Sequence, residues 1–240
     1  MSDELLRTHD NHLTRLTLNR PAKANTLSAS LVEALIDAVE YACTDGTRLL
    51  VIDGAGNHFC AGFDFTGYQE QSEGDLALRF IRIETLLQTL HHAPFETLAL
   101  AHGKIFGAGA DLVAACGIRV AAPGTTFHMP GLRFGVVLGT RRLAHRIGSD
   151  HARAILSESR TFGTDEALGI DFITRIEAQT QWPDIVQRTQ AHCEPLTPTA
   201  AAALHRQTTP DTRADDMSAL ARSVSTPGIR ERIRLYRESI

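Results

Sequence analysis

The hydrophobic and polar positions along the chain change period repeatedly, and these changes predict strands that alternate with helices. Residues 12–18 form an expected strand, which ends at Asn19-Arg20-Pro21. Residues 49–52 and 97–101 are wholly apolar, as is typical of strands covered on both faces. Residues 30–42 and 75–91 repeat apolar side chains at helical spacing, and Ser30 with Glu33 suggests a capping box at the first helix.

The second half of the chain changes from short strands to helices. Residues 118–121 and 126–129 are expected strands, and residues 139–147, 150–156 and 164–168 are expected helices. From about Trp182 onward, several prolines separate helical stretches, so the tail is interpreted as a helical region and not as a linker. We expect residues 1–190 to form the core that carries the site and residues 191–240 to form a helical C-terminal region.

Composition narrows the class of protein. The chain has 240 residues, of which 43% are hydrophobic and 22% charged, which suits a globular core and excludes a mainly disordered chain. The net charge of −4 argues against a nucleic-acid partner, and no apolar run is long enough to span a membrane. The start, Met1 to Glu4, is acidic and lacks a signal-peptide core, so we expect a cytoplasmic protein with reduced cysteines.

Most familiar chemical motifs are missing. Gly107-Ala108-Gly109 lacks the third glycine of a dinucleotide loop, because Leu112 stands at that position. The sequence has no HExxH metal motif and no GxSxG elbow, so neither a metal site nor a serine hydrolase is predicted. The arginines at 141–142 and 230–237 are interpreted as solvated helix faces.

Two glycine-containing turns remain, and each follows an apolar strand. They are residues 59–64, with the sequence FCAGFD, and residues 106–111, with the sequence FGAGAD. A glycine-rich turn that enters a helix leaves backbone N–H groups without partners. If the two turns converge, two N–H groups can bind one oxygen and form an oxyanion hole for a thioester carbonyl. From these residues alone, ordinary packing turns remain an alternative.

Four segments in order give a more specific indication. They are the segment from Leu16 to Pro21 with Asn25 and Leu27, residues 59–64, residues 107–119 and residues 127–135. In this order they resemble the motifs LNRPxxxNxL, FCAGxD, GGGxEL…xCDIR and FxxPExxxG of the crotonase superfamily, the enoyl-CoA hydratase/isomerase family. The resemblance covers about residues 12–175.

The resemblance implies an α/β fold, a crotonase-like spiral of ββα units with a helical C-terminal region used in oligomerisation. It implies a homotrimer or a dimer of trimers, and a CoA thioester as substrate with no prosthetic group. The oxyanion-hole donors would be the backbone N–H groups of Phe63 and Ala108. By motif position, the side that binds coenzyme A would be formed by Ala22, Lys23, Ala24, Ala61 and Phe65.

The chain departs from the family pattern at the acids. The first acid position of the hydratases falls at Asp111, but the second falls at Gly131, and a further aspartate found in some members is replaced by Gly139. Asp111 is therefore the expected proton-transfer group, with a dipole-stabilised residue of a first helical turn as the alternative. His128 is a weaker acid/base candidate.

The resemblance therefore implies an enoyl-CoA hydratase/isomerase family enzyme that acts through an oxyanion-stabilised enolate and is atypical at Gly131. A non-catalytic acyl-CoA-binding or scaffolding trimer is the alternative.

Overall fold

The computed structural model describes residues 3–239, so of the acidic start only Met1 and Ser2 lie outside the described residues. The larger sheet has six strands in the order β1-β2-β3-β4-β6-β9. Its strands are β1 (Leu5–Asp10), β2 (Leu13–Leu18), β3 (Leu49–Gly54), β4 (Glu96–Ala101), β6 (Ile118–Ala121) and β9 (Arg175–Ile176). Only the β1–β2 pair is antiparallel, and the other pairs are parallel.

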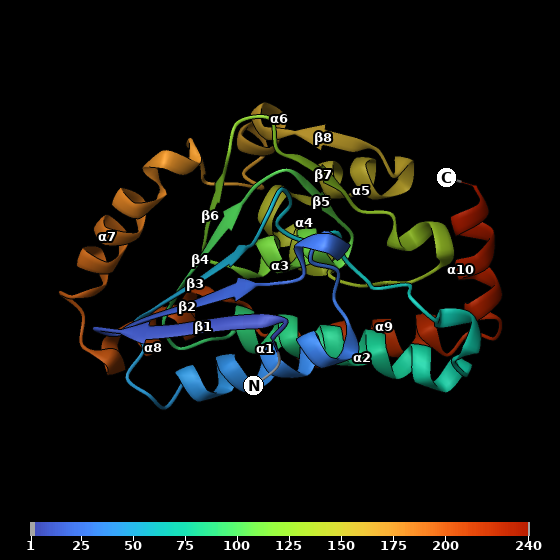
Figure 1. Ribbon diagram of the computed structural model, residues 1–240, viewed down its shortest axis with the longest axis horizontal. Coiled ribbons are helices and arrows are strands. Elements are labelled where there is room, and N and C mark those ends of the chain that lie inside the picture. The colour runs from blue at the N-terminus through green and yellow to red at the C-terminus, as the bar shows by residue number, and fades with distance from the viewer. Residues whose placement is uncertain (1–2, 240) are drawn as a thin grey trace.

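A smaller sheet is formed by β5 (Lys104–Phe106), β7 (Thr126–His128) and β8 (Thr161–Gly163). The chain passes from one sheet to the other and then into a helix, as in β4, β5 and α3 (Ala108–Ala115), and repeats this with β6, β7 and α4 (Thr140–Ile147). The expected spiral of ββα units is therefore confirmed, and its turns place β5 and α3 in the middle of the molecule (Figure 1).

Both faces of the larger sheet are covered by helices, as the wholly apolar strands predicted. On one face Leu50 and Ile52 pack with α1 (Ala29–Ala42) and α2 (Glu73–His91). On the other face Leu49 and Val51 pack against Trp182 of α7 (Trp182–Cys193). Figure 1 shows α1 and α2 below the strands and α7 at one end. No described helix is long and apolar enough to cross a membrane.

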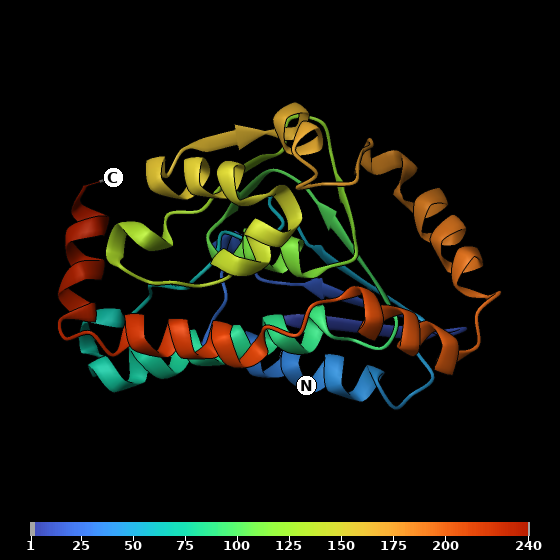
Figure 2. The ribbon, with the colours of Figure 1, turned by 180° about the vertical axis from the view of Figure 1, so that it is seen from behind.

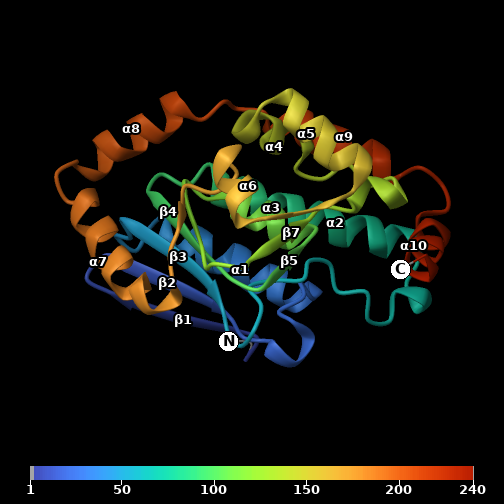
Figure 3. The same cartoon turned by 90° about the horizontal axis from the view of Figure 1, so that it is seen from above.

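The remaining helices are α5 (Ser149–Glu158), α6 (Thr164–Gly169), α8 (Pro198–Thr208), α9 (Arg213–Val224) and α10 (Ile229–Glu238). Seen from behind, α8 and α9 follow one edge of the molecule and α9 runs along α2 (Figure 2). From above, α7 and α8 extend away from the body at one end, and α10 stands at the opposite end (Figure 3). The expected helical tail is confirmed from α7 onward.

Several details of the local expectations were wrong. The first helix begins after Ser28, whose hydroxyl accepts from the Leu31 N–H at 3.1 Å, so the expected capping box of Ser30 and Glu33 does not form. Ser30 instead donates to Glu4 at 2.7 Å. A capping box does occur at α2, where Ser72 and Asp75 bond to each other's backbone. Strands β1, β5, β8 and β9 were not anticipated.

Candidate active site

The two glycine-containing turns converge, as the oxyanion-hole hypothesis required. The Phe106 N–H donates to the Cys60 carbonyl at 3.1 Å. Gly62 has φ +84°, and a Cβ there would lie 2.4 Å from the Phe106 carbonyl oxygen. A Cβ on Gly109 would lie 2.2 Å from the Cys60 carbonyl oxygen. Only glycine permits backbone contacts this close, so the glycines bring the turns together.

The backbone pattern leaves two N–H groups free at this junction. Leu27 pairs with residues on either side of Phe63: its N–H donates to Gly62 at 2.7 Å, and its carbonyl accepts from Asp64 at 3.3 Å. Ala108 is the first residue of α3, where a helical N–H has no intrahelical partner. Among the described residues, no hydrogen-bond acceptor is found for the N–H of Phe63 or Ala108.

Both residues line a cavity of about 160 Å³. Most of the lining is apolar, and much of it comes from phenylalanines of separate segments. Asp111 is the only carboxylate among the described lining residues, since Gly131 supplies no side chain. The two N–H groups and one carboxyl therefore share an apolar cavity.

Asp111 lies one turn after Ala108 on α3 and is 4% exposed. Its Oδ1 finds no hydrogen-bond partner among the described residues. Burial raises the pKa of Asp111 to about 8, which the Arg142 charge opposes and the Glu84 charge reinforces. Burial of this kind favours the protonated form of Asp111, whereas the helix dipole favours the ionised form, so the two effects oppose each other.

The positive charge of Arg142 does not cancel the effect of burial on the pKa of Asp111, because Arg142 is already paired with Glu84. Arg142 donates to Glu84 Oε1 at 2.9 Å, and both side chains are buried. Gln88 donates to the same oxygen at 2.9 Å. The interpretation of residues 141–142 as a solvated face was therefore wrong for Arg142, whose partner lies 58 residues away in sequence.

His128 does not face this cavity. Its Nε2 donates to the Ser159 carbonyl at 3.0 Å, and it lines a separate cavity with Arg133. Burial lowers the pKa of His128, which favours the neutral ring. The geometry therefore favours a structural histidine.

The residues expected to bind coenzyme A divide into two groups. Ala61 and Phe65 line the cavity, and the Ala61 N–H donates to the Ala24 carbonyl at 2.9 Å. Ala22 and Lys23 lie in the short helix η1 (Pro21–Lys23), where both are exposed. The structure thus connects Ala24 with the cavity wall and leaves Ala22 and Lys23 in the exposed turn beside it.

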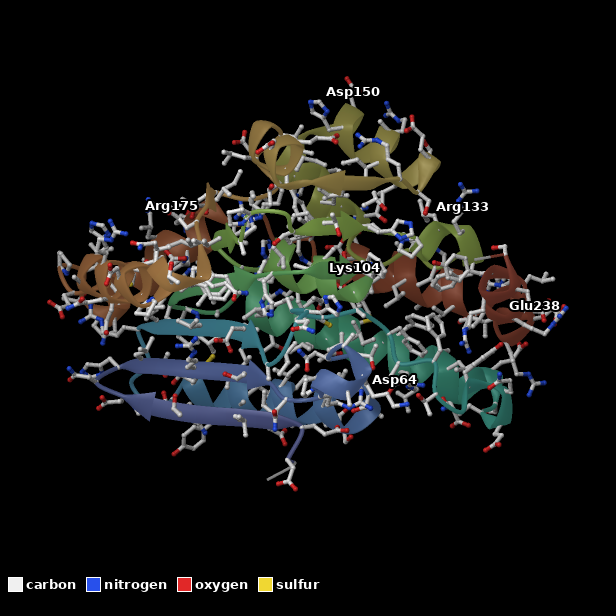
Figure 4. The ribbon with its side chains drawn as sticks, turned by 45° about the horizontal axis from the view of Figure 1, so that its top comes forward. Asp64, Lys104, Arg133, Asp150, Arg175 and Glu238 are labelled. Atoms are coloured by element: carbon white, nitrogen blue, oxygen red, sulfur yellow. The ribbon has the colours of Figure 1, made fainter. Side chains whose placement is uncertain are left out.

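Sequence reasoning missed two features of the site. One is the buried pair of Arg142 and Glu84. The other is the aromatic part of the cavity lining, to which Phe80 of α2, Phe134 of η3 (Gly131–Phe134) and Tyr236 of α10 contribute. Arg133 of η3 and Glu238 of α10 lie at the same end of the molecule, and Asp64 and Lys104 lie nearer its middle (Figure 4). No pattern in the sequence indicates that these distant segments meet.

A ββα spiral with two converging turns beside an apolar cavity is the architecture of the crotonase superfamily, to which this chain belongs. The model of the enoyl-CoA hydratase/isomerase family matches residues 8–227. The chain is 32% identical over 170 residues to a Mycobacterium leprae protein described as an enoyl-CoA hydratase, covering 68% of this chain and 67% of that protein. It spans about two thirds of the length of the curated relatives it matches.

Solved structures agree on the fold. A Bordetella parapertussis protein described as an enoyl-CoA hydratase/isomerase is 49% identical, with a TM-score of 0.97, covering 98% of this chain and 99% of that chain. An enoyl-CoA hydratase of Bacillus halodurans is 19% identical, with a TM-score of 0.86, covering 97% and 99%. The latter shows the shared fold alone.

Proposed function

We propose that the protein acts on an acyl-CoA thioester and moves a proton at its α-carbon through an enolate. The observation that carries this proposal is the arrangement of the Phe63 and Ala108 N–H groups and the Asp111 carboxyl around one cavity. Two N–H groups aimed at one oxygen stabilise the negative charge that a thioester carbonyl gains as it becomes an enolate. Removing one such donor typically costs about 10²–10³ in rate.

Asp111 moves the proton in this mechanism. In its ionised form it takes a hydrogen ion from the α-carbon, and the electron pair of the broken C–H bond delocalises onto the thioester oxygen. In its protonated form it returns a hydrogen ion to the α-carbon. The raised pKa of about 8 keeps both forms accessible near neutral pH, which is what a group that alternates between acid and base needs.

The coenzyme A portion is expected along the turn and short helix that lead to the cavity. Ala61 and Phe65 would contact the pantetheine, and Ala22, Lys23 and Ala24 would lie at the adenine side, with Lys23 available to a phosphate. The hydrogen bond from Ala61 to Ala24 supports one continuous path. We expect no prosthetic group, since coenzyme A enters as part of the substrate.

A non-catalytic acyl-CoA-binding or scaffolding trimer is the second candidate. Gly131 favours it, because a hydratase reaction of the two-acid type lacks its second acid here. The buried Asp111 favours catalysis, because an unpartnered carboxyl in an apolar cavity lowers the stability of a pure binding protein.

The proposal also covers the oligomeric state of the protein and its location in the cell. We propose a trimer or a dimer of trimers that forms through the helical region 191–240, and a role in fatty acid metabolism in the cytoplasm. The exposed Leu196 and Leu204, at and near α8, support an interface there because their side chains find no apolar cover within the chain. Light scattering should then give three or six times the protomer mass.

Exchange of α-hydrogen for deuterium tests the proposed chemistry. We expect mass spectrometry to show deuterium at the α-carbon when a saturated acyl-CoA is incubated with the protein in D₂O. Asp111→Asn should slow the exchange by about 10²-fold or more. Asp150→Asn is the matched control, because that carboxylate is exposed at the start of α5, on the outside of the molecule (Figure 4), and does not line the cavity. Binding without exchange in the wild type would select the scaffolding alternative.

A further inference from the structure

The acyl end of the cavity is bounded by five aromatic rings that contact one another in sequence. Phe63 and Phe80 are stacked with centroids 4.4 Å apart, and Phe63 and Phe65 are tilted at 5.0 Å. Phe65 meets Phe134 edge-on at 6.2 Å, and Phe134 meets Tyr236 at 5.1 Å. All five side chains line the cavity. They form a continuous wall, called the aromatic wall below.

The cavity is small in comparison with a long acyl chain. Its volume of about 160 Å³ is close to that of an apolar cavity of roughly 150 Å³ that holds one benzene molecule. Part of this volume lies beside Ala108 and Asp111, where the thioester carbonyl and the α-carbon belong. The space beyond the carbonyl is therefore at most that of about one six-membered ring.

The aromatic wall is held from behind, so it cannot easily withdraw to admit a longer chain. The Arg79 guanidinium lies 4.1 Å from the Phe63 ring centroid and donates to the Asp64 carbonyl at 2.7 Å. Phe63 is thus in contact with Arg79 and with Phe80. Phe63, Phe80 and Phe134 are each less than 7% exposed, and side chains packed this closely resist displacement.

The chemistry of the lining also selects the occupant. Aromatic rings prefer other rings in stacked or edge-on contact, and the five rings of the aromatic wall offer both arrangements. Arg237 is exposed at the rim, with its guanidinium 5.6 Å from the Phe65 ring centroid, so it does not place a charge deep in the aromatic wall. Besides Asp111, the polar side chains in the described lining are Thr140, Tyr236 and Arg237, so a polar acyl group would find few partners.

From size and chemistry together, we propose that the substrate's acyl group is compact and ring-bearing, with the ring on an α-carbon that still carries hydrogen: an arylacetyl or similarly sized acyl thioester of coenzyme A, not a long straight-chain one. This inference rests on the proposed function, because it assigns the acyl group of that same thioester. It makes Phe80 and Phe134 specificity-determining residues, because their rings line the cavity and neither residue supplies an oxyanion-hole N–H group.

Calorimetric titration with three thioesters that undergo no net reaction tests this assignment. Benzoyl-CoA carries the ring and has no α-hydrogen, and α-hydrogen exchange of the two saturated thioesters leaves them unchanged in water. Benzoyl-CoA should bind about tenfold more tightly than acetyl-CoA, which leaves the aromatic wall unfilled, and than decanoyl-CoA, which exceeds the cavity. Decanoyl-CoA binding as tightly as benzoyl-CoA would overturn the assignment and leave the proposed function intact. If neither free coenzyme A nor any of the thioesters binds, the proposed function fails and this inference fails with it.

A matched pair of variants adds an independent measurement. Phe80→Leu removes part of the aromatic wall, and Phe95→Leu is the control, because Phe95 is equally buried just before β4 and does not line the cavity. We expect Phe80→Leu to weaken the binding of benzoyl-CoA about fivefold or more and to reduce the ratio of its affinity to that of decanoyl-CoA. Phe95→Leu should change neither quantity. Equal effects of the two variants would contradict the assignment. Phe134→Leu provides the same test if Phe80→Leu does not fold.

Discussion

The carboxyl of Asp111 lies directly against Gly139: a Cβ at position 139 would be 1.9 Å from Asp111 Oδ1. Gly139 caps α4 with φ +63°, a left-handed conformation. The aspartate that some family members carry at this position could not stand here while Asp111 keeps its place. The aspartate at position 111 and the glycine at position 139 therefore depend on each other.

This contact predicts that Gly139→Ala destabilises the protein because of Asp111. Gly148→Ala is the matched control, since Gly148 has φ +80° with no atom near its would-be Cβ. The control should cost about 1–2 kcal/mol from backbone strain alone. Gly139→Ala should cost roughly 1–3 kcal/mol more from overpacking, measured by urea unfolding. Combining it with Asp111→Ala should recover most of that difference, and simple additivity would show that the two residues do not interact.

Asp111→Asn should stabilise the protein at alkaline pH. The folded-state pKa of about 8 lies above the usual value of 3.8, so the folded state holds its proton more tightly than the unfolded chain. The stability that this proton contributes is complete below about pH 4 and is lost as the pH rises through about 8. Unfolding free energies of variant and wild type should thus diverge between pH 4 and pH 8.5, in favour of the variant, while Asp150→Asn follows the wild type. Curves that stay parallel would show that Asp111 is ionised in the folded protein.

The rate of α-hydrogen exchange should rise with pH and level off above about pH 8, since the ionised form of Asp111 removes the hydrogen. Glu84→Gln should move the midpoint to lower pH, because the Glu84 charge disfavours ionisation of Asp111 and balances Arg142. Glu33→Gln, at an exposed ion pair on α1, is the control and should leave the midpoint unchanged. A profile without a midpoint near pH 8 would assign the proton transfer to another group.

Gly131→Glu should raise hydration of crotonyl-CoA, which we expect to be weak in the wild type. Position 131 lines the cavity, and a Cβ there would lie 3.1 Å from the Val136 carbonyl oxygen, a contact that a small shift relieves. A general acid or base typically contributes about 10²–10⁴-fold, so a gain of at least tenfold is expected in spite of imperfect geometry. Gly131→Gln should give no gain. Wild-type turnover at the level of a two-acid hydratase would refute the role assigned to this position.

Local chemistry explains which parts of the fold could be predicted from the sequence. The wholly apolar strands and the two glycine-containing turns are visible because their residues are neighbours in the chain. Strand β1 was missed because it is an edge strand whose residues are mostly exposed, so it lacks an apolar pattern. The first helix was given the wrong cap because Ser28 and Ser30 are both competent N-cap residues. In the structure both hydroxyls donate to Glu4, and Ser28 is the one that also accepts from a backbone N–H of the helix.

The candidate site was predictable only where its parts carry motifs. Phe63, Ala108 and Asp111 line one cavity, and their catalytic roles stay predictions. Arg142 looked like a surface residue because its partner, Glu84, stands on another helix with no spacing that relates the two. The size of the cavity depends on side chains from segments far apart in sequence, and no local pattern encodes it.

The place of α10 in the cavity wall has a thermodynamic consequence. Ile229 and Ile233 anchor this helix in the core, and Tyr236 supplies one of the five rings. A ligand that touches Tyr236 gains that contact only while the helix is docked. By thermodynamic linkage, bound ligand stabilises the docked helix by the same free energy by which the docked helix strengthens ligand binding. How long a ligand stays bound is then partly a property of a terminal helix, and slowed amide hydrogen exchange along α10 would report occupancy of a cavity lined mostly by other segments.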